Sequence, residues 1–139
     1  MEKIFVDTDI ILDLLAERKP FYDHAASLFS LADAGSIEMY ISALTIPNLH
    51  YILSGTLPSS EASKRLMQFK TLVNVLPLTD KIIDLALSSD FRDVEDAFQY
   101  FTAIEHHIPV LITRNLRDYK TATIAVMTAE QFIKSKIPR

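Results

Sequence analysis

The architecture of the chain is set by the stretch Ile4-Phe5-Val6-Asp7-Thr8-Asp9-Ile10-Ile11-Leu12-Asp13. Its β-branched and aromatic start predicts a short buried strand, and this strand stops at Asp7 before a segment with helical spacing begins. In open α/β sheets, the carboxyl ends of the strands border the crevice where ligands bind. We therefore expect Asp7 to lie at a ligand site.

Strand-like and helix-like segments alternate along the rest of the chain. Strands are expected at residues 37–42, 73–76, 110–113 and 124–127, and helices at residues 9–16, 21–34, 45–54, 59–72, 80–87, from 93 and from 128. A polar loop is expected at residues 114–121. This alternation predicts an α/β fold with three layers, in which helices cover both faces of a mostly parallel central sheet.

Several helix ends carry local signals. The first helix has Thr8 or Asp9 as its expected cap, and the helix from residue 59 has Ser59 or Ser60. Thr79 is expected to cap residues 80–87, and Thr128-Ala129-Glu130-Gln131 has the pattern of a capping box. Gly35 follows residues 21–34 at the position of a C-terminal cap.

Length and composition narrow the class of protein. A chain of 139 residues predicts one domain, residues 1–139, with a single core that buries about two-thirds of the unfolded surface. The absence of cysteine excludes disulfides, zinc–thiolate clusters and thiol nucleophiles. No apolar run reaches the roughly 18 residues of a membrane span, and Met1 leads directly into a strand, so we expect a cytoplasmic protein without a membrane partner. The net charge of -4 argues against wholesale capture of nucleic acid, although a bound cation or a basic rim could still receive phosphates.

Acidic residues recur at two further places where they could meet Asp7. Asp93 and Asp96 lie three apart at a helix start, although Asp93 could equally be a simple N-cap. Asp118 follows the strand at residues 110–113, in a second acidic strand end. Two such strand ends and a helix N-terminus could converge on one cation.

Other candidates have ordinary structural explanations. Arg114 and Arg117 could clamp phosphate, but surface ion pairs would explain them about as well. The pair His106-His107 is more typical of a solvated helix end than of a metal site, and His50 of a helix surface. Tyr100-Phe101 is more typical of a core than of a base-stacking platform.

Three segments together resemble the PIN-domain family, notably the toxin ribonucleases of bacterial toxin–antitoxin pairs. They are FVDTDIILDLL, ISALTIPNLHYIL and EDAFQYFTAIEHHIPVLITRNLRDY, and the resemblance covers nearly the whole chain. It implies a compact α/β/α fold whose acidic cluster binds Mg²⁺ or Mn²⁺ and hydrolyses phosphodiesters in single-stranded RNA. It also implies a small antitoxin as a protein partner and a homodimer.

The resemblance assigns roles to individual positions. Asp7, Asp96 and Asp118 match the family's acids, which makes them the expected catalytic residues and metal ligands. Such oxygen ligands can hold Mg²⁺ while leaving places for a phosphate and a water. The residues expected in support are Asp9, Asn48, Asp93, Thr113 and Asn115.

One position departs from the resembled pattern. Asn48 stands where active members typically carry a Glu, so a neutral carbonyl replaces a charged ligand. This motivates an alternative, a catalytically impaired PIN fold that binds nucleic acid or protein. A weaker alternative is a haloacid-dehalogenase-type phosphatase, because Asp7-Thr8-Asp9 fits its DxD opening although Ile11 does not fit.

Overall fold

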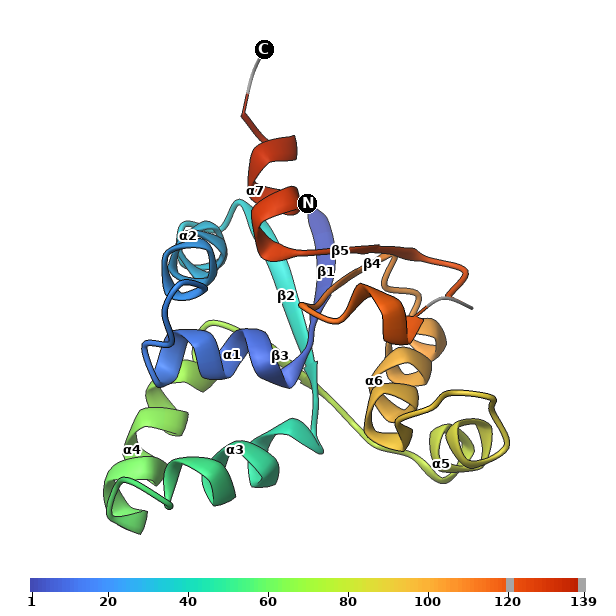
Figure 1. Cartoon of the computed structure of the whole chain (residues 1–139), viewed down its shortest axis with the longest axis horizontal. Coiled ribbons are helices and arrows are strands. Elements are labelled where there is room, and N and C mark those ends of the chain that lie inside the picture. Colours follow the sequence, from blue (N-terminus) through green and yellow to red (C-terminus); the bar gives the residue numbers. More distant parts are fainter. Residues whose placement is uncertain (120–121, 138–139) are drawn as a thin grey trace.

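The computed structural model describes residues 1–119 and 122–137 (Figure 1). Along the chain the elements are β1 (Glu2–Val6), α1 (Thr8–Leu15), α2 (Tyr22–Asp33), β2 (Ile37–Ser42), α3 (Thr45–Leu53), α4 (Ser59–Lys70), β3 (Asn74–Leu76), α5 (Asp80–Leu87), α6 (Val94–Glu105), β4 (Val110–Ile112), a 3-10 helix η1 (Leu116–Tyr119), β5 (Ala125–Met127) and α7 (Ala129–Ser135). Within the described part of the chain, no helix is long and apolar enough to cross a membrane.

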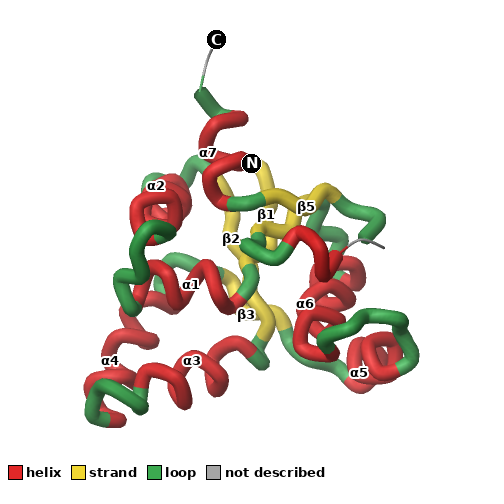
Figure 2. Tube along the Cα trace, viewed as in Figure 1, coloured by secondary structure: helices red, strands yellow, loops and turns green. Residues whose placement is uncertain are grey.

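The five strands form one parallel sheet in the order β3-β2-β1-β4-β5 (Figure 2). The first strand of the chain, β1, is therefore the central one, with β2 and β4 on either side. Because neighbouring strands are parallel, their carboxyl ends lie at the same edge of the sheet. Asp7 after β1 and Thr113 after β4 thus become neighbours, and the predicted parallel sheet is confirmed.

Helices cover both faces of this sheet, which confirms the predicted three layers. Helices α1, α2, α3, α4 and α7 lie on one face, and α5 and α6 lie on the other (Figure 1). Successive side chains of β1 point to opposite faces of the sheet and pack against both helical layers. Ile4 and Val6 belong to the first hydrophobic cluster and Phe5 to the second. The predicted single core is thus divided by the sheet into two clusters.

Three of the helix ends with local signals follow the sequence, and one does not. The Thr79 side chain accepts a hydrogen bond from the Ile82 amide, and Thr128 and Gln131 form the complete capping box. Gly35 has a φ of 76°, the left-handed conformation that glycine adopts at little cost. The predicted Ser cap of α4 is wrong, because the helix begins at Ser59 and Pro58 occupies the N-cap without a side-chain bond.

The start of α1 corrects the predicted cap. Thr8 is the first helical residue, and Asp7 occupies the N-cap without making a side-chain capping bond. The Thr8 amide instead donates a hydrogen bond of 3.1 Å to Oε1 of Gln99, which lies on α6. A side chain 91 positions away therefore satisfies this helix end, and the Asp7 carboxylate is left for another role.

Part of the segment predicted as a polar loop is helical, and one of its side chains is buried. Residues Leu116–Tyr119 form η1, and Tyr119 is 3% exposed, with its ring 5.8 Å from that of Phe91 in an edge-on arrangement. The aromatic ring supplies enough apolar contact to fold the segment back onto the second cluster. The last two positions of the predicted loop, Lys120 and Thr121, lie outside the described residues.

Candidate metal centre

Asp7 is the centre of the candidate site and is almost fully buried. Its Oδ2 accepts a hydrogen bond of 2.7 Å from the hydroxyl of Thr113. The same hydroxyl accepts a bond of 3.1 Å from the Asn115 amide, so it is fixed from both sides. The side chains of Asp7 and Thr113 meet because their strands are hydrogen-bonded neighbours, and the Asp7 amide also bonds to the carbonyl of Ile112 at 2.9 Å.

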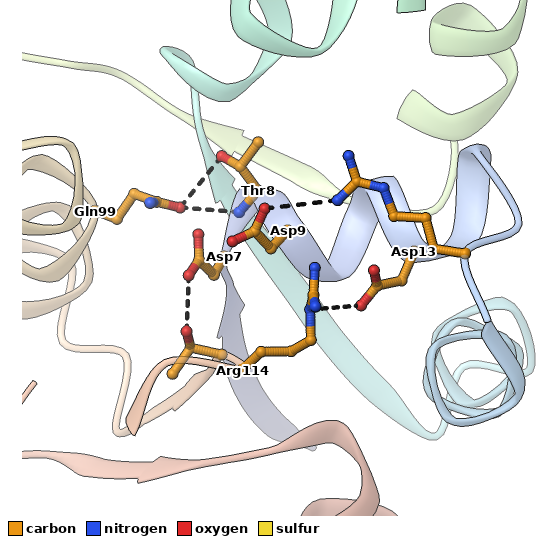
Figure 3. Close-up of polar contacts among 8 residues, drawn as sticks. Asp7, Thr8, Asp9, Asp13, Gln99 and Arg114 are labelled. Carbon is orange, nitrogen blue, oxygen red and sulfur yellow. Dashed lines mark hydrogen bonds and ion pairs between the residues drawn. The ribbon is translucent and has the colours of Figure 1, made fainter. Parts of the chain in front are cut away.

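A second polar contact joins three helices beside Asp7. Gln99 is buried, and its Oε1 receives hydrogen bonds from the amide and the hydroxyl of Thr8 (Figure 3). The Thr8 hydroxyl also lies 3.2 Å from that of Thr45. These contacts hold the starts of α1 and α3 against α6. Gln99 was not among the residues predicted for the site, although its spacing of three from Asp96 places the two on one helix face.

The surroundings of Asp7 make its negative charge unfavourable. Burial is the main cause that raises the pKa of this carboxyl, and the nearby charge of Asp9 raises it further. Hydrogen bonds from Thr113 and Gln99 oppose the increase without cancelling it. The protein therefore holds a carboxylate in a position where a cation would stabilise it.

Asp96 is the second buried carboxylate of the site, in the first turn of α6. Burial raises its pKa to about 7, together with the negative charges of Asp7, Asp93 and Asp118. The hydroxyl of Tyr119 donates a bond of 3.3 Å to Asp96 Oδ1 and opposes this increase. Asp96 is thus close enough to the other three carboxylates to feel their charges. Tyr119 was not predicted as a site residue, because its segment was expected to be a polar loop.

The other predicted acidic residues occupy different positions. Asp93 is exposed and caps α6, because its Oδ1 accepts a bond of 2.9 Å from the Glu95 amide. Asp118 lies half-buried in η1. Asp9 forms a 4.0 Å ion pair with Arg18, and both side chains are 40% exposed.

Asn48 lies in α3 and contacts a residue that the sequence analysis did not select. Its side-chain amide donates a hydrogen bond of 3.2 Å to Oε1 of Glu95, in the first turn of α6. Both side chains are half-buried. Burial raises the pKa of Glu95 most, followed by the charges of Asp7 and Asp93, so Glu95 belongs to the same electrostatic neighbourhood.

Arg114 has a partner other than the acidic site. Its Nε lies 3.1 Å from Oδ2 of Asp13, whose side chain is 1% exposed (Figure 3). Its guanidinium carbon also lies 4.1 Å from the centre of the Phe21 ring, a favourable cation–π distance. Arg117, the other predicted phosphate ligand, is exposed in η1 beside Asp118.

The remaining candidates have structural roles. The His50 ring lies within 3.1 to 3.5 Å of the hydroxyls of Ser63, Ser59 and Ser54. His106 occupies the C-cap of α6, which is the solvated helix end that we expected. Tyr100 and Phe101 pack in the second hydrophobic cluster, in agreement with the core interpretation.

The donor set of the site fits a hard divalent cation in its chemistry. Asp7, Asp96 and Asp118 supply carboxylate oxygens, and no Lys or Arg of the described residues forms an ion pair with any of them. Burial is the main cause of the raised pKa values of Asp7 and Asp96, and the negative charges of neighbouring carboxylates add to it. Across residues 1–119 and 122–137, no three Asp, Glu or His side chains are grouped closely enough to surround one ion.

Comparisons with known proteins identify the family of this chain. The family model described as PIN domain matches residues 3–117. Ribonuclease VapC1 from Aquifex aeolicus (strain VF5) is 27% identical over an alignment of 139 positions, and this alignment covers 94% of this chain and 93% of that protein.

Two solved structures share the fold. VapBC-1 from nontypeable Haemophilus influenzae has a TM-score of 0.69 at 17% identity and covers 92% of this chain and 98% of its own. A toxin–antitoxin complex from Klebsiella pneumoniae has a TM-score of 0.68 at 22% identity, and the match covers 91% of this chain and 97% of that chain.

Proposed function

Because the chain belongs to the PIN-domain family, we propose that it is a metal-dependent endoribonuclease that hydrolyses single-stranded RNA. The observation that carries this proposal is Asp7, a buried carboxylate at the carboxyl edge of the sheet that is close enough to Asp9 and Asp96 for their charges to interact. Among the described residues, no Lys or Arg forms an ion pair with it. The similarity to a curated ribonuclease over nearly the whole of both chains supports the choice of reaction.

In this proposal Asp7, Asp96 and Asp118 hold Mg²⁺ or Mn²⁺. When bound, such an ion makes a water molecule more acidic and neutralises charge on the attacked phosphate. The protein contributes by fixing its own oxygens in place. Thr113 orients Asp7 through the 2.7 Å bond, and Tyr119 orients Asp96.

The remaining polar residues support RNA binding in different degrees. Arg117 is exposed next to Asp118, where it can reach a phosphate of the substrate. Arg114 contacts Asp13 and Phe21, so its charge already has a structural use. We therefore propose Arg117, in preference to Arg114, as the residue that binds phosphate.

We also infer a protein antitoxin as partner. Solved structures that share this fold include a toxin–antitoxin complex, and the curated relative is a VapC ribonuclease. A homodimer is proposed on the same basis. Light scattering at tens of micromolar tests the dimer, and a monomer at that concentration would contradict it.

The test of the activity is a time course on a single-stranded RNA oligonucleotide. Wild type with Mn²⁺ should cleave it, and the same protein in EDTA or the Asp7→Asn variant should not. Cleavage that survives Asp7→Asn would contradict the proposal. p-Nitrophenyl phosphate serves as a second substrate, because a phosphatase of the haloacid-dehalogenase type would hydrolyse it whereas a ribonuclease would leave it intact.

A further inference from the structure

The contact between Asn48 and Glu95 joins two elements of the proposed site. Asn48 lies on α3 and Glu95 on α6, 47 positions apart in the sequence, and 3.2 Å separates Nδ2 of one from Oε1 of the other. Asn48 is the position where the resembled family typically carries a carboxylate. Here the carboxylate belongs to the residue that touches Asn48 from the opposite helix.

Glu95 is held in place at both its backbone and its side chain. Its amide donates to Asp93 Oδ1 at 2.9 Å, which fixes the first turn of α6, and its Oε1 accepts from Asn48. The side chain is half-buried, and none of the ion pairs among the described residues includes it. A carboxylate that is ordered, partly desolvated and without a cation resembles Asp7 and Asp96 more than a surface Glu.

We propose that Glu95 is a ligand of the divalent cation and replaces the carboxylate that position 48 lacks, with Asn48 as the residue that positions it. This inference rests on the proposed function. Asn48 and Glu95 together contribute one negative charge to the site. That charge would be the same if position 48 carried the carboxylate and position 95 the amide. Asn48 engages Oε1 by hydrogen bonding, which leaves Oε2 as the oxygen for the cation.

The same contact explains why one acid, and not two, occupies this pair of positions. Two carboxylates with oxygens about 3 Å apart repel each other strongly in a partly desolvated setting. Asn48→Glu alone would create that repulsion in the metal-free protein. The alternative is that Glu95 only stabilises the N-terminus of α6. In that case, removing its charge would leave the affinity for the cation unchanged.

The test is Mn²⁺ binding followed by electron paramagnetic resonance, with no RNA present. The proteins are wild type, Glu95→Gln, Asn48→Glu and the double variant Asn48→Glu/Glu95→Gln. Glu95→Gln should weaken Mn²⁺ binding by about 10-fold or more, because a neutral amide replaces a charged ligand. The double variant should recover affinity to within a few-fold of wild type, and circular dichroism verifies that each variant is folded.

A matched control is Glu105→Gln, which removes a carboxylate from the other end of the same helix, where it pairs with Lys81 at 2.9 Å. It should bind Mn²⁺ as wild type does. Wild-type affinity in Glu95→Gln would overturn the inference, and so would a folded double variant as weak as Glu95→Gln. If Mn²⁺ binding is lost in Asp7→Asn but unchanged in Glu95→Gln, only this inference fails. A wild type that binds no Mn²⁺ would overturn the proposed function as well.

Discussion

Asp7 and Asp13 are two buried carboxylates of the same ten-residue stretch, and they differ in how their charge is balanced. Asp13 has a cation, since Nε of Arg114 lies 3.1 Å from its Oδ2. Among the described residues Asp7 has only neutral donors, chiefly the hydroxyl of Thr113. Thr113 and Arg114 are consecutive, so one strand end supplies a neutral donor to the first carboxylate and a positive charge to the second.

This difference separates a structural acid from a functional one. Burial raises the pKa of both carboxyls. At Asp13 the charges of Arg114 and Arg18 oppose this increase without cancelling it, whereas at Asp7 the nearby charge of Asp9 adds to it. A buried carboxylate that the fold neutralises holds elements together, here α1 and the segment after β4. One that the fold leaves unneutralised is available to a cation from solution.

The largest expected effect comes from removing the unneutralised charge. Asp7→Asn should lower RNA cleavage by about 1,000-fold or more, because a lost ion removes several kcal/mol of transition-state stabilisation. The metal-free variant should be at least as stable as wild type, since a repelling charge is gone. Initial cleavage rates in Mn²⁺ and urea unfolding in EDTA measure the two effects, and a variant that is both active and unstable would reverse our assignment.

Breaking the neutralised pair should act on stability instead. Arg114→Met leaves Asp13 buried without its cation, and we expect a loss of about 3 kcal/mol in the free energy of unfolding. Asp13→Leu combined with Arg114→Met should recover most of that loss, because apolar side chains can replace a buried ion pair. Urea unfolding at neutral pH measures both variants. A loss below about 1 kcal/mol in Arg114→Met would show that the pair is not structural.

A third prediction uses the raised pKa of Asp96. This pKa is about 7 in the folded protein and 3.8 for an unperturbed Asp, so the folded state binds the proton more tightly. The resulting stability is fully present below about pH 3.8 and is lost as the pH rises through 7. Metal-free wild type should therefore be about 2 kcal/mol more stable at pH 5.5 than at pH 7.5, relative to the same difference in Asp96→Asn. Equal pH dependence in the two proteins would remove Asp96 from the charged cluster.

The smallest effect should follow from Tyr119→Phe. The variant loses a single hydrogen bond to Asp96 Oδ1, which we expect to cost about 1 kcal/mol or less. Because that bond lowers the pKa of Asp96, the transition near pH 7 should move upward in the variant. The pH dependence of urea unfolding shows the shift, and a downward shift would contradict the contact.

Sequence was sufficient where the determining contact is local or follows from strand order. Thr79 and the Thr128–Gln131 box cap their own helices, so residue type and spacing were enough. The placement of Asp7 and Thr113 at one edge follows from parallel strands, whatever their exact length. Asp93 caps α6, which agrees with its interpretation as a simple N-cap.

The residues that the sequence analysis missed depend on distant partners. Gln99 contacts Thr8 across 91 positions, Glu95 contacts Asn48 across 47, and Tyr119 contacts Asp96 across 23. No periodicity within one element specifies which side chain of another element lies opposite. Burial of Asp13 was missed for the same reason, because its cation comes from the strand end after β4.

The most direct test compares Asp7 with Asp13 in one Mn²⁺ titration, in which the melting temperature of each variant is measured. Millimolar Mn²⁺ should raise the melting temperature of wild type by mass action on the native state. The increase should vanish in Asp7→Asn and persist in the Asp13→Leu/Arg114→Met double variant, which removes the neutralised pair without changing net charge. An increase that persists in Asp7→Asn, or one that vanishes only in the double variant, would contradict the assignment of the cation to Asp7.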